Sequence, residues 1–234
     1  MPQTGDYDKL ASGGEYNGDE YSYFDVYIYP NTSSEENTAE TDVADAIINF
    51  AEILVGGDEV SFYNIYLSNN YPDINESNPG DYLSEFRDWI QDSNREYDKN
   101  EGSHLAVSDN FESGKAYQGY SNDSAYTTGK AAVMGTTGST PYMQNGVIQE
   151  VCHNYLIEDV ISSYTGNDDN DHDLGTVTKD DQLVTPMATS YVGPHRASTT
   201  GQCRSNYWTA AGYTTEPTYC TTDAMDLVAN TEVD

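Results

Sequence analysis

The charge of this chain constrains its fold more than any other feature. The 234 residues include 40 Asp and Glu but only nine Lys and Arg, which gives a formal net charge of −31. Chains as acidic as this are often disordered, but disordered segments are poor in aromatic residues. This chain contains 21 Tyr, five Phe and two Trp. We therefore expect a folded domain whose acidic side chains cover its surface.

The same charge excludes two classes of partner. Nucleic acid and anionic membrane surfaces are themselves negative and would repel this surface. No apolar run reaches the roughly 18 residues that a membrane-spanning helix needs. We expect no nucleic-acid partner and no membrane insertion, whereas the sequence leaves the oligomeric state open.

The acidity also predicts adaptation to high salt. In molar salt the Debye length falls to about 3 Å, so the repulsion among surface carboxylates fades. Only five residues are Lys, and we expect an extremely halophilic, archaeal source. Sequons at Asn31, Asn75 and Asn122 are compatible with an extracellular or cell-surface location. The first ten residues show no signal-peptide pattern, so that location requires a leader that has been removed.

Hydrophobic periodicity predicts one α/β (α+β) domain over residues 21–234, preceded by a flexible, polar lead-in over 1–20. Alternating apolar residues indicate a half-buried strand over 21–29, and a helical stripe follows over 38–55. The remaining elements that we expect are strands over 60–68, 104–107 and 131–134 and helices over 81–97, 143–164 and 222–230.

The predicted helix over 143–164 places Gln149, Glu150 and His153 on one side, because residues three or four apart share a helix face. Zinc hydrolases with the H-E-x-x-H pattern use this geometry: two His hold the metal and the Glu takes a proton from the activated water. Here Gln149 replaces the first His. By itself the E-x-x-H pattern more often marks a surface Glu and a half-buried His.

Three features together resemble the metzincin metallopeptidases. They are His153-Asn154, the downstream pair His172-Asp173, and the segment TPMATSY over 185–191. The resemblance covers about 20–230 as architecture and about 149–191 as motif. It implies a twisted mixed sheet, an active-site helix, a Met-turn and a C-terminal helix. It also implies a zinc cofactor and a peptide or protein substrate.

Carried over position by position, the resemblance assigns four roles. Glu150 matches the general base and His153 a metal ligand. Met187 matches the methionine of the Met-turn, and Tyr191 matches a tyrosine that helps to hold the oxyanion in some members.

The chain departs from the family pattern at the other two metal ligands. The neutral amide of Gln149 is a poorer zinc donor than imidazole. Leu156 stands where the family has the Gly that turns the chain toward the third ligand, which leaves Asp159 and His172 as candidates. We expect the helix to continue through Leu156, because no turn signal appears before Gly166, and this favours His172.

The other candidate sites are weaker. The run NDDNDHD over 167–173 resembles a calcium loop but lacks the Gly and the Glu that an EF-hand needs, so only incidental calcium is expected. Cys203 and Cys220 bracket a loop that a disulfide would close, although three buried thiols explain the cysteines equally well. Cys152 lies inside the predicted helix, where a core position is expected.

Two functions from different classes remain open. The first is a zinc-dependent endopeptidase adapted to high salt, which hydrolyses peptide bonds with a metal-activated water. The second is a catalytically inactive pseudo-protease that serves as a binding or cell-surface module, and the Gln149 substitution favours it.

Overall fold

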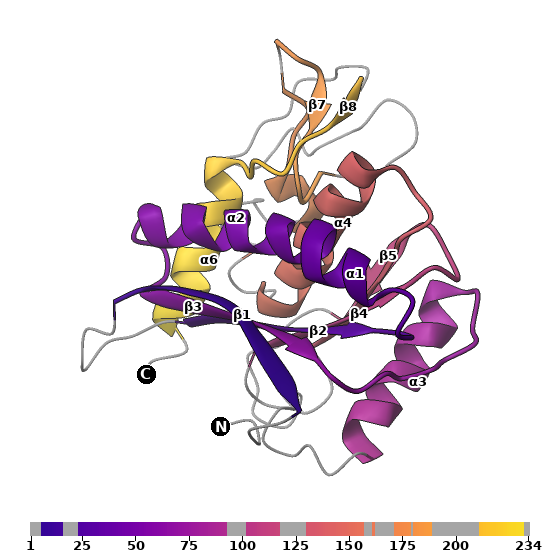
Figure 1. The fold of residues 1–234 in the computed structure, drawn as a ribbon. Helices are drawn as coiled ribbons and strands as arrows, with labels where there is room; N and C mark the ends of the chain where they lie inside the picture. Colours follow the sequence, from indigo (N-terminus) through magenta and orange to yellow (C-terminus); the bar gives the residue numbers. More distant parts are fainter. Residues whose placement is uncertain are drawn as a thin grey trace.

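The computed structural model describes residues 6–15, 23–92, 102–117, 130–156, 161, 171–178, 180–188 and 211–231. The expected α/β (α+β) class is confirmed, because a six-stranded mixed sheet carries helices on both faces (Figure 1). The strands of this sheet are β1 (Tyr7–Gly14), β2 (Tyr23–Pro30), β3 (Phe62–Ser68), β4 (Ser103–Ser108), β5 (Gly114–Ala116) and β6 (Ala131–Gly135).

A helix is present at each expected position, although the helix predicted over 143–164 ends earlier than expected. The helices are α1 (Glu36–Thr38), which continues through a π-helical turn (Ala39–Val43) into α2 (Ala44–Gly56), then α3 (Pro79–Asp92), α4 (Thr140–Tyr155), a short 3-10 helix (Asp171–Leu174) and α6 (Tyr219–Thr231). A second small sheet pairs β7 (Leu183–Val184) with β8 (Gly212–Tyr213) in parallel.

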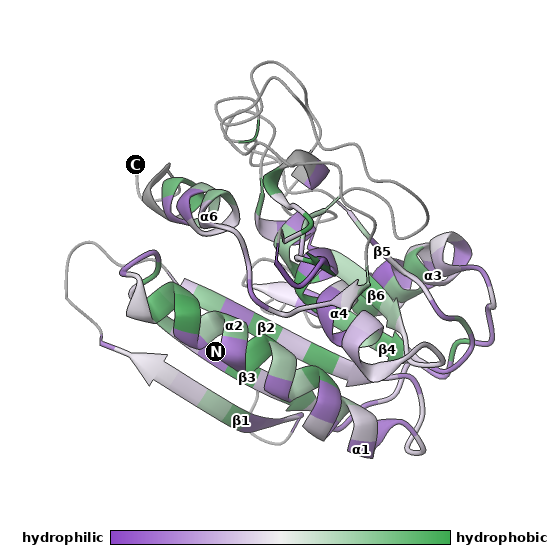
Figure 2. Ribbon diagram, turned by 90° about the horizontal axis from the view of Figure 1, so that it is seen from above, coloured by the Kyte–Doolittle hydropathy of each residue, from purple (hydrophilic) through white to green (hydrophobic). Residues whose placement is uncertain are grey.

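The strand order in the large sheet is β1-β3-β2-β4-β6-β5. The four inner strands are parallel to one another, and the two edge strands β1 and β5 run antiparallel to their neighbours. Helices α2, α4 and α6 pack on one face and α3 packs on the other. Figure 2 shows α2 lying over β2 and β3 and running roughly along them, with hydrophobic and hydrophilic segments alternating along the helix.

Strand β2 lies inside the sheet and is buried on both faces. Phe24, Val26 and Ile28 join the core under α2 and α4, as the alternation predicts. Tyr27 and Tyr29, however, are 1% and 0% exposed and belong to the core under α3. The expectation of a half-buried strand is therefore wrong, because parallel strands are covered on both sides by their connecting helices.

Residues 7–14 form the edge strand β1, so the expectation of a flexible lead-in is wrong there. The strand pairs with β3, and Lys9 Nζ donates a hydrogen bond of 2.6 Å to Asn64 Oδ1 on that strand. Its side chains are exposed or half-buried, which explains why the sequence carries no alternating apolar signal.

A buried carboxylate joins the end of β2 to the loop after β4. Glu35 is 4% exposed, and its Oε2 accepts hydrogen bonds from the backbone N–H and the hydroxyl of Thr32. Its Oε1 accepts from the backbone N–H of Asp109 at 2.7 Å. The charge is thus held by hydrogen-bond donors that the fold itself provides.

Helix α4 ends at Tyr155, earlier than expected. Leu156 has an extended backbone, with ψ of 126°, and its side chain is fully buried in the core. The expectation that the helix continues through Leu156 is wrong, because burying this side chain takes the chain out of the helix without needing a Gly. No helix within the described ranges is long and apolar enough to cross a membrane.

Candidate metal centre

Helix α4 carries the predicted motif on its buried side. Gln149 is 2% and Glu150 5% exposed, and His153 is half-buried. The next residue, Asn154, fixes the end of the helix on the sheet: its Nδ2 donates to the backbone carbonyls of Tyr117 and Ala131, and its Oδ1 accepts from Ser103 Oγ. The motif therefore sits on a rigid element, which is what a preorganised site requires.

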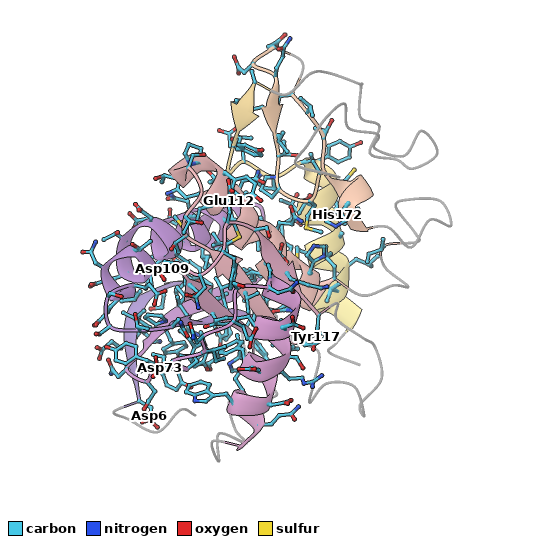
Figure 3. All side chains as sticks on the ribbon, turned by 90° about the vertical axis from the view of Figure 1, so that its right-hand side faces the viewer. Asp6, Asp73, Asp109, Glu112, Tyr117 and His172 are labelled. Carbon is cyan, nitrogen blue, oxygen red and sulfur yellow. The ribbon has the colours of Figure 1, made fainter. Side chains whose placement is uncertain are left out.

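Three of the predicted side chains come together. Gln149 Nε2 lies 3.4 Å from His153 Nε2 and 3.5 Å from His172 Nδ1. The two imidazole rings are 4.8 Å apart between centroids and nearly perpendicular, at 78°. His172 comes from the short 3-10 helix, and Figure 3 shows it well separated from Asp6 on strand β1's side of the molecule. Asp159, the other candidate ligand, lies outside the described residues.

The spacing within this cluster is long for hydrogen bonds. An N–H donor normally lies about 2.9–3.0 Å from its acceptor. Two donor atoms that each lie about 2.0–2.1 Å from a tetrahedral zinc ion are about 3.3 Å apart. The distances of 3.4 and 3.5 Å are thus closer to those between ligands of a shared ion.

The oxygen of Gln149 is left without a partner. Its Oε1 is buried, and no atom of the described residues makes a hydrogen bond with it. A buried polar atom of this kind calls for an explanation, and an ion is one. Where the structure is described, it has no group of three or more His, Cys, Asp and Glu that would hold a metal, because the third member of this cluster is an amide.

Glu150 occupies the space beside the edge strand β5. A Cβ added at Gly114 would lie 2.5 Å from Glu150 Cγ and 2.6 Å from its Oε1. Any side chain at position 114 would therefore overlap the Glu150 carboxylate, and glycine leaves the space that this carboxylate occupies. Sequence reasoning missed both β5 and Gly114, because a three-residue strand rich in small residues leaves no periodic signal.

The pKa of a tyrosine near the start of α4 is raised by its surroundings. Burial, together with Tyr213 and the carboxylates of Glu112 and Glu150, raises the pKa of Tyr142 to about 12. The Tyr142 and Tyr213 rings lie 5.2 Å apart, edge to face. Tyr142 therefore keeps its proton at any physiological pH and remains a hydrogen-bond donor.

Met187 sits in a tight turn that is locked to the segment after His172. Its side chain is fully buried, and its backbone is left-handed with φ of +64°. The backbone N–H of Gly175 donates to the Met187 carbonyl at 2.8 Å. A Cβ at Gly175 would lie 2.0 Å from the backbone nitrogen of Ala188, so the two segments approach as closely as glycine allows.

The remaining candidates are only partly described. Tyr191, Cys203 and residues 167–170 of the acidic run lie outside the described residues. Cys220 forms a disulfide, and its expected pairing with Cys203 stays a prediction. Cys152 is fully buried in α4 and belongs to the hydrophobic core, which confirms the expected core position.

Comparison with known proteins gives little further information. No family model and no curated protein matches the sequence. A solved structure that resembles the chain is metalloproteinase-II from Bacteroides fragilis, with 12% identity and a TM-score of 0.41. The match covers 63% of this chain and 46% of that one, so this chain spans less than half of its length. A likeness this weak carries no argument about function, and the cluster is interpreted from its own geometry.

Proposed function

We propose that this chain is a zinc-dependent metallopeptidase whose metal is held by Gln149, His153 and His172. One observation carries the proposal: the three side chains converge at the spacing of metal ligands, and the buried oxygen of Gln149 has no partner. A half-turn of the Gln149 amide about its Cγ–Cδ bond exchanges Nε2 and Oε1. The residues then fit the ion, because an oxygen and two imidazole nitrogens face one another.

The chain's own residues supply the rest of the chemistry. When bound, zinc would polarise the scissile carbonyl and lower the pKa of water. Glu150 would take the proton of the attacking water and deliver it to the leaving amine. Its buried position beside β5 excludes bulk water from the carboxylate. Tyr191 keeps its proposed role as a donor to the oxyanion.

A second candidate is the pseudo-protease, a module that binds a peptide or protein without cleaving it. The observation in its favour is Gln149 itself, because a neutral amide oxygen binds zinc less well than imidazole. Glu150 favours the enzyme, since a binding module gains nothing from a buried carboxylate on the helix that carries Gln149 and His153.

Two measurements separate these candidates. Elemental analysis of protein purified in molar salt without a chelator should find stoichiometric zinc. Glu150→Gln should then lower kcat/KM for a peptide substrate by about 10²–10⁴-fold, the usual contribution of a general base, while zinc content stays the same. The control is Glu52→Gln, which removes an exposed carboxylate on α2. Absence of zinc even after incubation with excess ion would overturn the metal site, and zinc without cleavage of any peptide would favour the pseudo-protease.

We propose in addition that the protein works outside the cell of a salt-adapted archaeon. The net charge of −31 supports this proposal. Of the sequons, Asn75 is exposed, whereas Asn31 is 3% exposed and its amide donates to the Ile74 carbonyl, so Asn31 is no glycan acceptor. Near-UV circular dichroism should be lost on dialysis to low salt, and an unchanged spectrum would contradict salt adaptation.

A further inference from the structure

A second buried amide oxygen lies one helical turn before the metal cluster. Asn145 is fully buried on α4, and its Oδ1 and Gln149 Oε1 are the two buried side-chain polar atoms without a partner in the described part of the chain. Asn145, Gln149 and His153 are spaced four residues apart, so they form one stripe along the helix.

The orientation of the Asn145 amide is fixed by its surroundings. Its Nδ2 donates to the carbonyl of Val184 on β7 at 2.9 Å and to that of Thr214, just after β8, at 2.7 Å. Both N–H groups are therefore used. Turning the amide over would bring its oxygen against two carbonyl oxygens, so Oδ1 is a fixed acceptor on the stripe.

The Gln149 amide has no such constraint. Its contacts to the two imidazoles are long, and its oxygen makes none. Long side chains on a helix lean toward the N-terminus and over the residue four positions earlier. His153 leans over Gln149 in this way, as their contact shows, and the same rule places Gln149 over Asn145. Amide pairs at this spacing form hydrogen bonds along helices.

We infer that Asn145 is a positioning residue for the metal ligand Gln149. With the ion bound, the Gln149 amide is turned so that Oε1 faces the two imidazoles and Nε2 donates to Asn145 Oδ1. One half-turn thus converts two unpartnered oxygens into a hydrogen bond and a metal ligand. This inference rests on the proposed metal site, and it explains how a neutral amide is held with its oxygen toward an ion.

The test is a double-mutant cycle read as zinc affinity, measured by competition with a chromophoric chelator. The four proteins are the wild type, Asn145→Ala, Gln149→His and the double variant. Residues that orient a metal ligand typically contribute 10–100-fold to metal affinity. We expect Asn145→Ala to weaken zinc binding at least about tenfold when Gln149 is present. We expect little change in the Gln149→His background, where the ligand is an imidazole and no amide needs orienting.

Equal losses in both backgrounds would overturn the inference and make Asn145 a purely structural tie to β7 and β8. Failure of both the wild type and Gln149→His to bind zinc would overturn the proposed metal site and this inference with it. If Asn145→Ala does not fold, a crystal structure of the zinc-loaded wild type serves instead. It should show Gln149 Oε1 on the ion and Gln149 Nε2 within hydrogen-bond distance of Asn145 Oδ1, and the absence of that hydrogen bond would contradict the inference.

Discussion

The turn after α2 offers a sharp test of how the acidic surface affects stability. Glu59 is half-buried there and faces α6. Burial first, and then the charges of Asp226, Asp223 and Asp58, raise its pKa above the ordinary value of 4.5, while a hydrogen bond with Thr222 acts in the opposite direction. The charged form of Glu59 therefore destabilises the fold.

We predict that Glu59→Gln stabilises the protein near neutral pH, at the lowest salt concentration at which the wild type stays folded. The amide keeps the size of the side chain and an acceptor for Thr222. Removing repulsion from three like-charged neighbours, at about 0.3 kcal/mol each after solvent screening, gives about 1 kcal/mol. For a domain of this size that corresponds to a rise of about 2–4 °C in Tm.

The pH dependence follows from the direction of the pKa shift. Because the pKa in the folded state is raised, the folded protein holds the proton more tightly than the unfolded chain. Wild type and Glu59→Gln should be equally stable below pH 4.5, where Glu59 is protonated in both states, and should differ fully once the pH exceeds the raised pKa. Molar salt should remove the part of the difference that comes from the three aspartates, since the Debye length is then about 3 Å, and should leave the part that comes from burial.

Thermal unfolding followed by circular dichroism, over a pH series at that lowest salt concentration and in molar salt, measures this difference. Glu52→Gln is the matched control, because Glu52 is exposed on α2 and has no acidic residue three or four positions away. A gain for Glu59→Gln that equals the control, that persists in acid, or that is undiminished by molar salt would refute the reasoning.

Three further substitutions test individual contacts. Gly175→Ala places a methyl group 2.0 Å from the backbone nitrogen of Ala188, so chemical denaturation should show a loss at the upper end of the roughly 1–3 kcal/mol typical of overpacking; a stability equal to wild type would contradict the close approach. Gly114→Ala should displace the Glu150 carboxylate and lower kcat/KM by about 100-fold, the effect of a misplacement near 1 Å, with zinc affinity unchanged; retained cleavage would argue against Glu150 as the base. Asn31→Asp removes a buried amide donor and should cost about 1–3 kcal/mol in urea unfolding; a neutral effect would show that this hydrogen bond is dispensable.

The inner elements of the fold were predictable because their side chains face a core. The alternation over 21–29 and the apolar stripe over 38–55 correspond to β2 and to the continuous helix that ends at Gly56. The edge strands β1 and β5 were not predictable. They are held by backbone pairing with their neighbours, and their side chains, which are exposed or half-buried, follow no apolar pattern.

The site shows the same division between local and distant contacts. Helix spacing alone brings Gln149 beside His153, and the downstream His-Asp pair pointed to His172. Asn145 left no signal, because its partners lie 39 and 69 residues away along the chain. The end of α4 at Tyr155 was also missed, since it depends on the burial of Leu156 in a core that only the tertiary structure creates.

The hydrogen bonds to the Glu35 carboxylate show how a buried acid can be stabilised in a chain with few basic residues. A buried carboxylate is commonly paired with Lys or Arg, and replacing that cation leaves a buried charge without a partner. Here two main-chain N–H groups and one hydroxyl donate hydrogen bonds to the Glu35 carboxylate. A main-chain N–H group is kept in every substitution except one to proline. Basic residues can therefore be lost from the surface without leaving the Glu35 carboxylate unpaired in the interior.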